Sequence, residues 1–312
     1  MYRQVLVKES DREYQRILWR DSPDKPMGHF RLNTVTYGTV PASFLATRVL
    51  KELAIANVSQ DPKASNSIMK DFYMDDYISG ANDVKEAELL YLSVSKILES
   101  RGMQLRKWCS NGEQMRKTFI NASSETHHSL DLGPEETTTS LGLNWCPNSD
   151  NLLFLNKLLK SSRSDTKREL LSTLNSVFDP LGFLGPVLIR GKVFLQELWQ
   201  LKLGWDDKLP VHIQNRWQLF IEDLKKLDRL KIPRAARINY TGPIELHGFC
   251  DASQIAFGAC VYLRQRIDAN TYQMRLLCAK SRVAPTKTLT IPRLELSGAV
   301  LLSELMHRVS EA

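Results

Sequence analysis

The sequence predicts an α+β protein of two or three domains. Three observations support this fold class over the 312 residues. The first 150 residues mix short β-branched segments with amphipathic helical ones, and residues 166–230 have helical spacing alone. From residue 244, three alternating strands precede one final helix. We therefore expect domains at 1–150, 151–240 and 241–312.

The first domain is expected to hold a helix at 42–57, after a strand at 31–37 and a turn at Gly38–Pro41. Residues 71–80 predict a hairpin with two acids at its tip, and Asn82-Asp83 caps a helix that Gly102 ends. Further strands are expected at 104–108 and 140–145. A polar surface excursion is expected between them, at 121–139.

The rest of the chain divides at a change of pattern near residue 165. Helices are expected at 166–178, 187–203 and 211–230, with a Pro- and Gly-containing break between the first two. A linker at 232–242 leads to strands at 244–250, 256–264 and 273–279. The last helix opens at Thr290-Ile-Pro292, with proline in its first turn.

Composition excludes several classes of protein. The chain is 43% hydrophobic and 25% charged, which argues against wholesale disorder. It has no uninterrupted apolar run of about 18 residues, and its charged first residues do not resemble a secretory signal. Five scattered cysteines without a CxxC pair disfavour a disulfide framework and a zinc ribbon. We expect an intracellular protein, cytoplasmic or nuclear, without a membrane.

The net charge of +7 comes from one segment. Residues 151–240 contain 16 Lys and Arg against 9 Asp and Glu, so the remaining residues are neutral overall. A basic segment between neutral ones indicates a polyanionic partner. The alternative is a solvated, lysine-rich helical surface.

Asp75 and Asp76 form the first candidate site. Two adjacent carboxylates repel each other unless a cation neutralises them, and the apolar strands around them hold them at one tip. Mg²⁺, or Mn²⁺ in its place, is bound by one or two carboxylates together with phosphate oxygens. A bare Asp-Asp pair can also be a solvated turn, and the flanking Tyr73, Met74 and Tyr77 favour the metal site.

The ordered motifs resemble reverse transcriptases, most closely those of BEL/Pao-class LTR retrotransposons. Phe72-Tyr73-Met74-Asp75-Asp76 resembles the Tyr-x-Asp-Asp box, and Tyr37 to Arg48 resembles the glycine-containing template and nucleotide motif. Segments 1–20, 105–108 and 141–145 resemble the other motifs in the same order. The resemblance covers nearly the whole chain.

This resemblance implies an incomplete right-hand polymerase palm followed by a helical thumb and connection. Asp75 and Asp76 would hold two Mg²⁺ ions for nucleotidyl transfer. Tyr2, Gly38, Tyr73, Met74 and Lys107 would contact the nucleotide or template. The primer grip would comprise Leu141, Gly142 and Trp145.

The implied partners are an RNA template, a DNA primer, an RNA/DNA hybrid, deoxynucleoside triphosphates and other parts of the Pol polyprotein. The basic block would lie along duplex phosphates. Each of these residues also has a structural interpretation. Tyr2 is near a chain end, and Lys107 is typical of a solvent-facing residue. Trp108 and Trp145 are typical of core residues.

Asp251 and Glu295 form the second candidate site. Asp251 ends a strand and Glu295 lies in the first turn of a helix, an order similar to that of ribonuclease H. The resemblance implies that both residues bind metal ions that activate water for RNA cleavage. The alternatives are a turn residue at Asp251 and a helix-dipole partner at Glu295.

The chain departs from the family pattern at both sites. The first palm aspartate of the family precedes the position of Tyr2, and the ribonuclease H-like mixed sheet lacks a further aspartate. The expectation is a truncated piece of a polyprotein that is a weak catalyst. The competing hypothesis is a catalytically dead, nucleic-acid-binding relic. An aspartic protease is excluded, because no Asp-Thr-Gly or Asp-Ser-Gly occurs.

Overall fold

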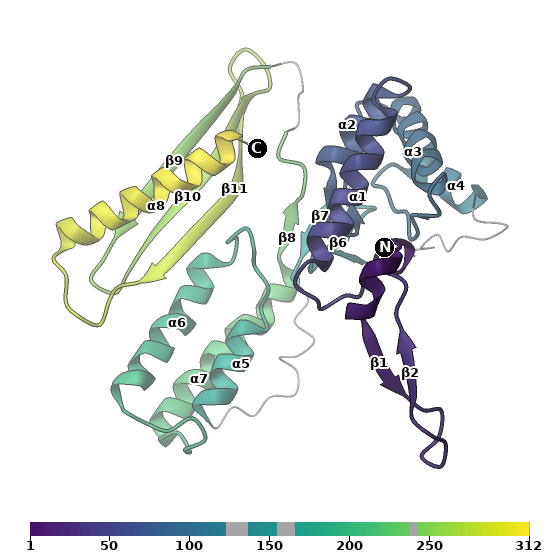
Figure 1. Cartoon of the computed structure of the whole chain (residues 1–312). Coiled ribbons are helices and arrows are strands. Elements are labelled where there is room, and N and C mark those ends of the chain that lie inside the picture. Colours follow the sequence, from purple (N-terminus) through teal and green to yellow (C-terminus); the bar gives the residue numbers. More distant parts are fainter. Residues whose placement is uncertain (123–136, 155–165, 238–241, 312) are drawn as a thin grey trace. The chain divides into compact units, whose positions relative to one another are not determined.

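The computed structural model describes residues 1–122, 137–154, 166–237 and 242–311 (Figure 1). The chain divides into two compact units, 1–135 and 136–312, which are described separately. Both contain helices and small sheets, so the α+β fold class is confirmed.

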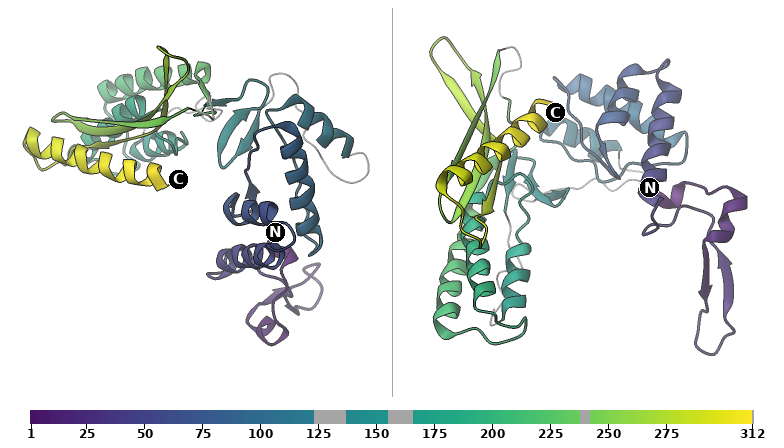
Figure 2. Two further views of the ribbon diagram at one scale, coloured as in Figure 1. Left: turned by 90° about the horizontal axis from the view of Figure 1, so that it is seen from above. Right: turned by 60° about the vertical axis from the view of Figure 1, so that its left-hand side comes forward.

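The first unit begins with two 3₁₀ helices, η1 (Tyr2–Gln4) and η2 (Glu9–Tyr14). A hairpin of β1 (Arg16–Trp19) and β2 (Gly28–Arg31) follows and projects from the rest of the unit (Figures 1 and 2).

The strand expected at 31–37 is wrong, because only Arg31 belongs to β2 and Thr34 makes an isolated bridge with Leu6. The backbone of this segment instead pairs with the irregular chain near Val5, where Val35 is buried.

Four helices form the body of this unit. The predicted helix at 42–57 is α1 (Ala42–Asn57), and Asp83 caps α3 (Val84–Glu99) as expected. Two helices were not predicted, α2 (Pro62–Lys70) and α4 (Glu113–Ala122), although Asp61-Pro62 is a helix-start signal. Residues from α1, α2 and α3 share one apolar core.

The hairpin expected at 71–80 is present, as β3 (Phe72–Tyr73) paired with β4 (Asp76–Tyr77). The strand expected at 104–108 is wrong. Lys107 has a left-handed φ of 60°, and Trp108 packs into an aromatic cluster with Tyr77, Tyr91 and Phe119. The aromatic packing of the half-buried indole therefore accompanies a backbone path that the alternating pattern does not predict. Most of the excursion expected at 121–139 lies outside the described residues.

The second unit opens with a sheet in the order β5 (Thr138–Ser140), β6 (Leu143–Cys146), β7 (Asn151–Leu153) and β8 (Lys231–Pro233). The strand expected at 140–145 is confirmed over Leu143–Trp145 in β6, but Leu141 and Gly142 both have positive φ and form a tight hairpin turn, so Ser140 belongs to a separate strand, β5. The expected linker at 232–242 begins with two residues of β8, which pairs with β7.

Three helices follow, as predicted: α5 (Lys167–Asn175), α6 (Gly185–Gln200) and α7 (Val211–Lys225), continued by η4 (Lys226–Arg229). Thr166 and Glu169 form a capping box at the start of α5. The helices share an apolar core that includes the fully buried Trp217.

The last part is a meander with strand order β11-β10-β9, made from β9 (Ile244–Ala252), β10 (Ala256–Arg266) and β11 (Tyr272–Val283). Helix α8 (Ile291–Glu311) crosses one face of this sheet (Figures 1 and 2). Alternate β10 residues, Ala259, Val261 and Leu263, are buried on one face of the sheet.

The helices and the meander are joined at the outer edge of β11. The backbone N–H of Ala279 donates to the carbonyl of Leu181, 2.8 Å away, and the Gln196 amide donates to the carbonyl of Ala284. Gly182 has a φ of +75°, and a Cβ there would lie 1.8 Å from the Ala279 oxygen. The break between α5 and α6 is therefore a docking loop that requires glycine.

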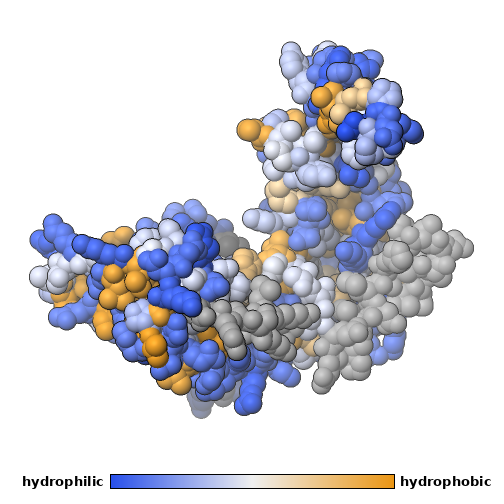
Figure 3. Space-filling model, turned by 90° about the horizontal axis from the view of Figure 1, so that it is seen from below, coloured by the Kyte–Doolittle hydropathy of each residue, from blue (hydrophilic) through white to orange (hydrophobic). Residues whose placement is uncertain are grey.

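Hydrophobic side chains on the exposed surface are interspersed with hydrophilic ones in the view of Figure 3. The projecting hairpin carries several of them, including Leu18, Trp19 and Phe30. Within the described ranges, no helix combines the length and apolarity that a membrane span requires.

Candidate functional site

The Asp75–Asp76 pair lies at the tip of the β3–β4 hairpin. Asp75 is in the two-residue turn, Asp76 starts β4, and both are exposed. Met74, the first turn residue, has a φ of 59°, which is the pattern of a type II′ turn. Tyr73 is also exposed, while Met74 is half-buried, so the tip is accessible on the side of its carboxylates.

These two carboxylates suit a hard cation. Neither has a hydrogen-bond or ion-pair partner within the described part of the chain. In a Mg²⁺ site the protein usually supplies one or two carboxylates, and phosphate oxygens and water complete the coordination shell. The two unpartnered carboxylates match this contribution. The described residues contain no group of three His, Cys, Asp or Glu placed to hold a metal.

The other predicted palm residues belong to the same unit as the acidic pair. The Tyr2 hydroxyl lies 3.4 Å from Ser43 Oγ, and its ring packs against the core. Gly38 has a φ of +83° with open space around it, as a close approach by a ligand requires. Lys107 is exposed next to Trp108, whose ring is a packing residue of the aromatic cluster.

The predicted primer-grip residues form a hairpin in the second unit. Leu141 is partly exposed at the turn, and a Cβ at Gly142 would lie 2.8 Å from the Phe178 ring. The Trp145 indole N–H donates to Asp150 Oδ1 at 2.9 Å, and the Arg234 guanidinium lies over the same ring. Trp145 is therefore a packing residue, while the Leu141 turn is accessible.

Helix α8 crosses the sheet next to the backbone of Asp251, one turn after Glu295. Gly298, one turn after Glu295, is so close to β9 that a Cβ would lie 3.5 Å from the Asp251 carbonyl oxygen. The same Cβ would lie 3.7 Å from Cys250 Cβ, so Cys250 faces α8 and, by strand alternation, Asp251 projects from the opposite face. Both carboxylates are exposed, and the Asp251 carboxylate accepts a hydrogen bond from the Ala252 N–H.

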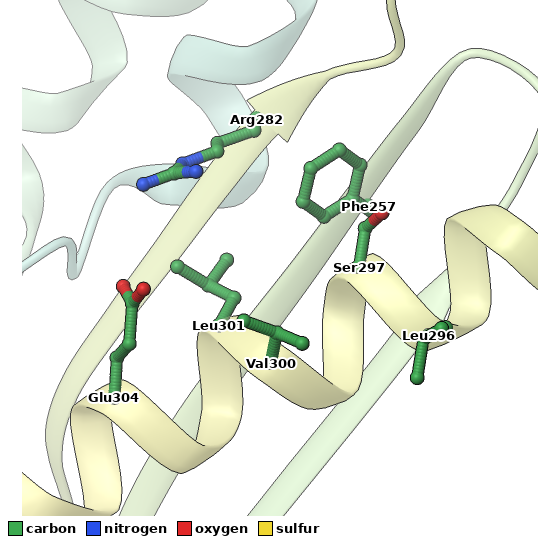
Figure 4. Close-up of a pocket in the computed structure, with 7 residues that line it drawn as sticks. All are labelled: Phe257, Arg282, Leu296, Ser297, Val300, Leu301 and Glu304. Atoms are coloured by element: carbon green, nitrogen blue, oxygen red, sulfur yellow. The ribbon is translucent and has the colours of Figure 1, made fainter.

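A groove of about 300 Å³ lies beside this crossing, between α8 and the strands β10 and β11 (Figure 4). Phe257, Leu296 and Val300 supply apolar lining, and Arg282 and Glu304 lie toward one end. Glu295 does not line the groove, so the groove is separate from the second candidate site.

Ion pairs neutralise much of the basic helical segment. Arg168 binds Asp206, Arg216 binds Glu197, and Arg234 binds Asp150. Lys167 is buried with its ammonium 3.7 Å from the Trp199 ring centroid. The exposed basic residues of this segment with no ion pair in the described structure are Lys192, Lys202, Lys208, Lys225, Arg229 and Lys231.

Sequence reasoning missed one polar cluster next to the acidic hairpin. Ser67, Asp71, Tyr77 and Ser79 share hydrogen bonds at its base. The available signal was the Ser67–Asp71 spacing of four residues, which places two side chains on the same face of a helix. It could be used only if α2 had been predicted.

Comparison with known families gives one match, within the second unit. Residues 166–312 match a family of RNaseH-like domains, which indicates a nucleic-acid partner. The family is described as the Pao retrotransposon-like RNaseH-like domain, so over this part the resemblance to the Pao class is supported. The match begins at α5 and includes the three helices docked on β11. No curated protein matches the chain.

Proposed function

We propose that this chain is part of a retrotransposon polyprotein and carries the palm of an RNA-directed DNA polymerase, together with the RNaseH-like module. The observation that supports polymerase function best is the exposed Asp75–Asp76 pair on a tight turn, whose carboxylates have no partner among the described residues. The Pao-type match over 166–312 supports the retrotransposon origin.

In this proposal, Asp75 and Asp76 hold Mg²⁺ at the 3′ end of a DNA primer on an RNA template. The bound ions supply charge that stabilises the attacking and leaving oxygens of nucleotidyl transfer. Gly38 leaves room for the incoming deoxynucleotide, and the Tyr2 ring, held near Ser43, borders its sugar. The turn at Leu141–Gly142 contacts the primer.

Primer extension tests the polymerase proposal. The full chain is assayed with an RNA template, a DNA primer, deoxynucleotides and Mg²⁺. Losing a metal ligand removes several kcal/mol of transition-state stabilisation, so Asp75→Asn should lower the rate on the order of a hundredfold or more. Asp24→Asn, which neutralises an exposed acid elsewhere in the same unit, is the control and should change little. Synthesis that survives Asp75→Asn refutes the assignment.

The RNaseH-like module is proposed to act on RNA/DNA hybrids through Asp251 and Glu295. Glu295→Gln should abolish Mg²⁺-dependent cleavage of the RNA strand. Glu304→Gln is a matched control on the same helix, since Glu304 is exposed and lies at the end of the separate groove. Equal cleavage by both variants would remove Glu295 from the proposed site.

A non-catalytic, nucleic-acid-binding relic is the second candidate. It is favoured by the absence of a three-ligand acidic group among the described residues. Such a protein would bind hybrids with strong salt dependence and make no product. Hybrid binding without extension or cleavage, and unchanged by Asp75→Asn, would favour this candidate over the polymerase.

The unpaired cations of the helical segment should carry the salt dependence. Lys225 ends α7, Arg229 ends the η4 helix that continues it, and both are exposed. Each phosphate contact that is lost should lower the slope of log affinity against log salt by about one. Binding titrations of Lys225→Ala and Arg229→Ala at several salt concentrations measure this. Arg216→Ala, which removes a cation already paired with Glu197, should leave the slope nearly unchanged.

A further inference from the structure

A connected group of four polar side chains lies at the base of the acidic hairpin. The Asp71 Oδ2 atom accepts hydrogen bonds from Ser67 Oγ and from Ser79 Oγ, each at 2.6 Å. Ser67 Oγ is also 2.7 Å from the Tyr77 hydroxyl. The single hydroxyl hydrogen of Ser67 is used on Asp71, so Tyr77 donates to Ser67. The chain of donors therefore runs from Tyr77 through Ser67 to Asp71, and Ser79 donates to the same oxygen.

These side chains connect α2 to both strands of the hairpin. Ser67 lies in the last turn of α2 and is only 6% exposed. Asp71 follows the helix directly, with its N–H bonded to the Ser67 carbonyl and its own carbonyl accepting the Ile78 N–H. Tyr77 is in β4 and Ser79 follows that strand. A shift of the hairpin against α2 would break several of these bonds together.

The hairpin needs an external support. It has only two residue pairs, and an isolated two-stranded hairpin is marginally stable in water. Its turn also places a non-glycine residue, Met74, in the left-handed region, which surrounding structure must enforce. The Tyr77 ring packs against Phe72 and Trp108, which fixes the position of its hydroxyl next to Ser67.

We infer that Ser67, Asp71 and Ser79 are positioning residues, which orient the Asp75–Asp76 turn for binding a cation. The inference rests on the proposed function of that pair. These residues do not touch the cation, because their polar atoms are used at the base of the hairpin while the acids lie at its tip. In metal sites generally, residues that hydrogen-bond to a ligand-bearing segment orient the ligands without contacting the metal. Ser67, Asp71 and Ser79 act in the same way.

Binding of Tb³⁺ to the full chain tests this inference without measuring catalysis. Tb³⁺ is a hard, oxygen-binding ion, and Tyr73 and Tyr77 are close enough in sequence to the pair to sensitise its luminescence. Ser79→Ala removes one hydroxyl at an exposed position, so the fold should survive. We expect it to weaken Tb³⁺ binding on the order of tenfold. Ser79→Thr restores the hydroxyl and should restore affinity.

Two controls separate the possible causes. Ser10→Ala removes another exposed serine that donates to an aspartate, Asp11, and should leave Tb³⁺ binding unchanged. The double variant Asp75→Asn, Asp76→Asn should abolish the tyrosine-sensitised signal. Thermal unfolding of every variant shows how much of each protein is folded during the titration.

The outcomes distinguish this inference from the proposed function. If the double variant loses the signal and Ser79→Ala binds Tb³⁺ as the parent chain does, the positioning role is overturned while the acidic pair remains the cation site. A lower unfolding temperature in Ser79→Ala with unchanged affinity also overturns the positioning role, because it shows a structural role alone. If no signal depends on Asp75 and Asp76, both the cation site and the positioning role fail.

Discussion

The two acidic sites are supported in opposite ways. Asp75 and Asp76 lie on a hairpin of two residue pairs, which is held from outside by side-chain hydrogen bonds to α2. Asp251 lies near the end of a nine-residue strand, and Glu295 lies on a helix that packs along the same sheet. The first site thus depends on a few polar side chains, and the second on backbone pairing and close packing.

This contrast indicates which substitutions should disturb each site. At the hairpin, loss of single hydrogen bonds should change the orientation of the acids and leave most of the unit intact. At the sheet, added volume at close backbone approaches should cost stability first, since protein interiors tolerate little extra volume. Substitutions of glycines therefore test the packing of the second unit. Substitutions of helix caps and turn residues test the support of the hairpin in the first unit.

The largest effect is expected at the docking loop of the second unit. Gly182→Ala places a Cβ 1.8 Å from the Ala279 carbonyl oxygen at a φ of +75°, so the backbone must move. We expect a loss of about 3 kcal/mol in chemical denaturation. Gly248→Ala is the control, because the nearest atoms to its Cβ would be side-chain atoms of Leu302 and Met306, which can move. Equal losses would contradict the expectation that a Cβ against the Ala279 backbone costs more than one against side-chain atoms.

The next effect concerns the crossing of α8 over β9. Gly298→Leu must push α8 away from Asp251 and should cost about 2 kcal/mol. Gly298→Ala should be nearly neutral, since its Cβ would make ordinary contacts of 3.5–3.8 Å and alanine favours the helix. Thermal unfolding of both variants measures the difference. A well-tolerated leucine would contradict the close crossing on which the second site depends.

A smaller effect is expected at the start of α2, which supports the acidic hairpin. The Asp61 carboxylate accepts the Ala64 N–H at 2.9 Å, and this bond, with help from Ser93, lowers the pKa of Asp61. Asp61→Ala should cost about 1 kcal/mol at neutral pH.

The pH dependence of this cap has a defined sign. Because the folded pKa is lowered, the stabilising contribution is complete above the pKa of an unfolded aspartate and is lost as pH falls through the folded value. Asp61→Asn keeps a capping oxygen without titrating. Its stability deficit relative to the parent chain should therefore shrink as the solution is acidified. A deficit that grows in acid would contradict the capping geometry.

The smallest effect is expected at the turn itself. Met74→Gly removes backbone strain of about 1–2 kcal/mol in the left-handed region. Glycine also raises the conformational entropy of the unfolded chain, which costs roughly 0.5–1 kcal/mol of stability. The net gain should lie between about 0 and 1.5 kcal/mol in thermal unfolding. A clear loss would mean that the Met74 side chain makes packing contacts that outweigh the strain.

Local signals predicted much of the fold. Asp83 and the Thr166–Glu169 capping box start helices where expected, and the alternation of β9 to β11 gives the meander. The strands expected at 31–37 and 104–108 were wrong for a shared reason. Alternation and β-branching suggest extended chain, but a strand also needs a partner, and the first segment pairs only with irregular chain while the second packs as part of an aromatic cluster.

The sequence alone determined where the carboxylates lie along the chain and which elements carry them, because helix starts and tight turns depend on neighbouring residues. Only the tertiary structure decided how they are held. The contacts of Asp71 with Ser67 and Ser79, and the opposite projection of Asp251 from α8, join or separate residues through packing between elements. Such packing depends on burial across the whole unit, which no local pattern records.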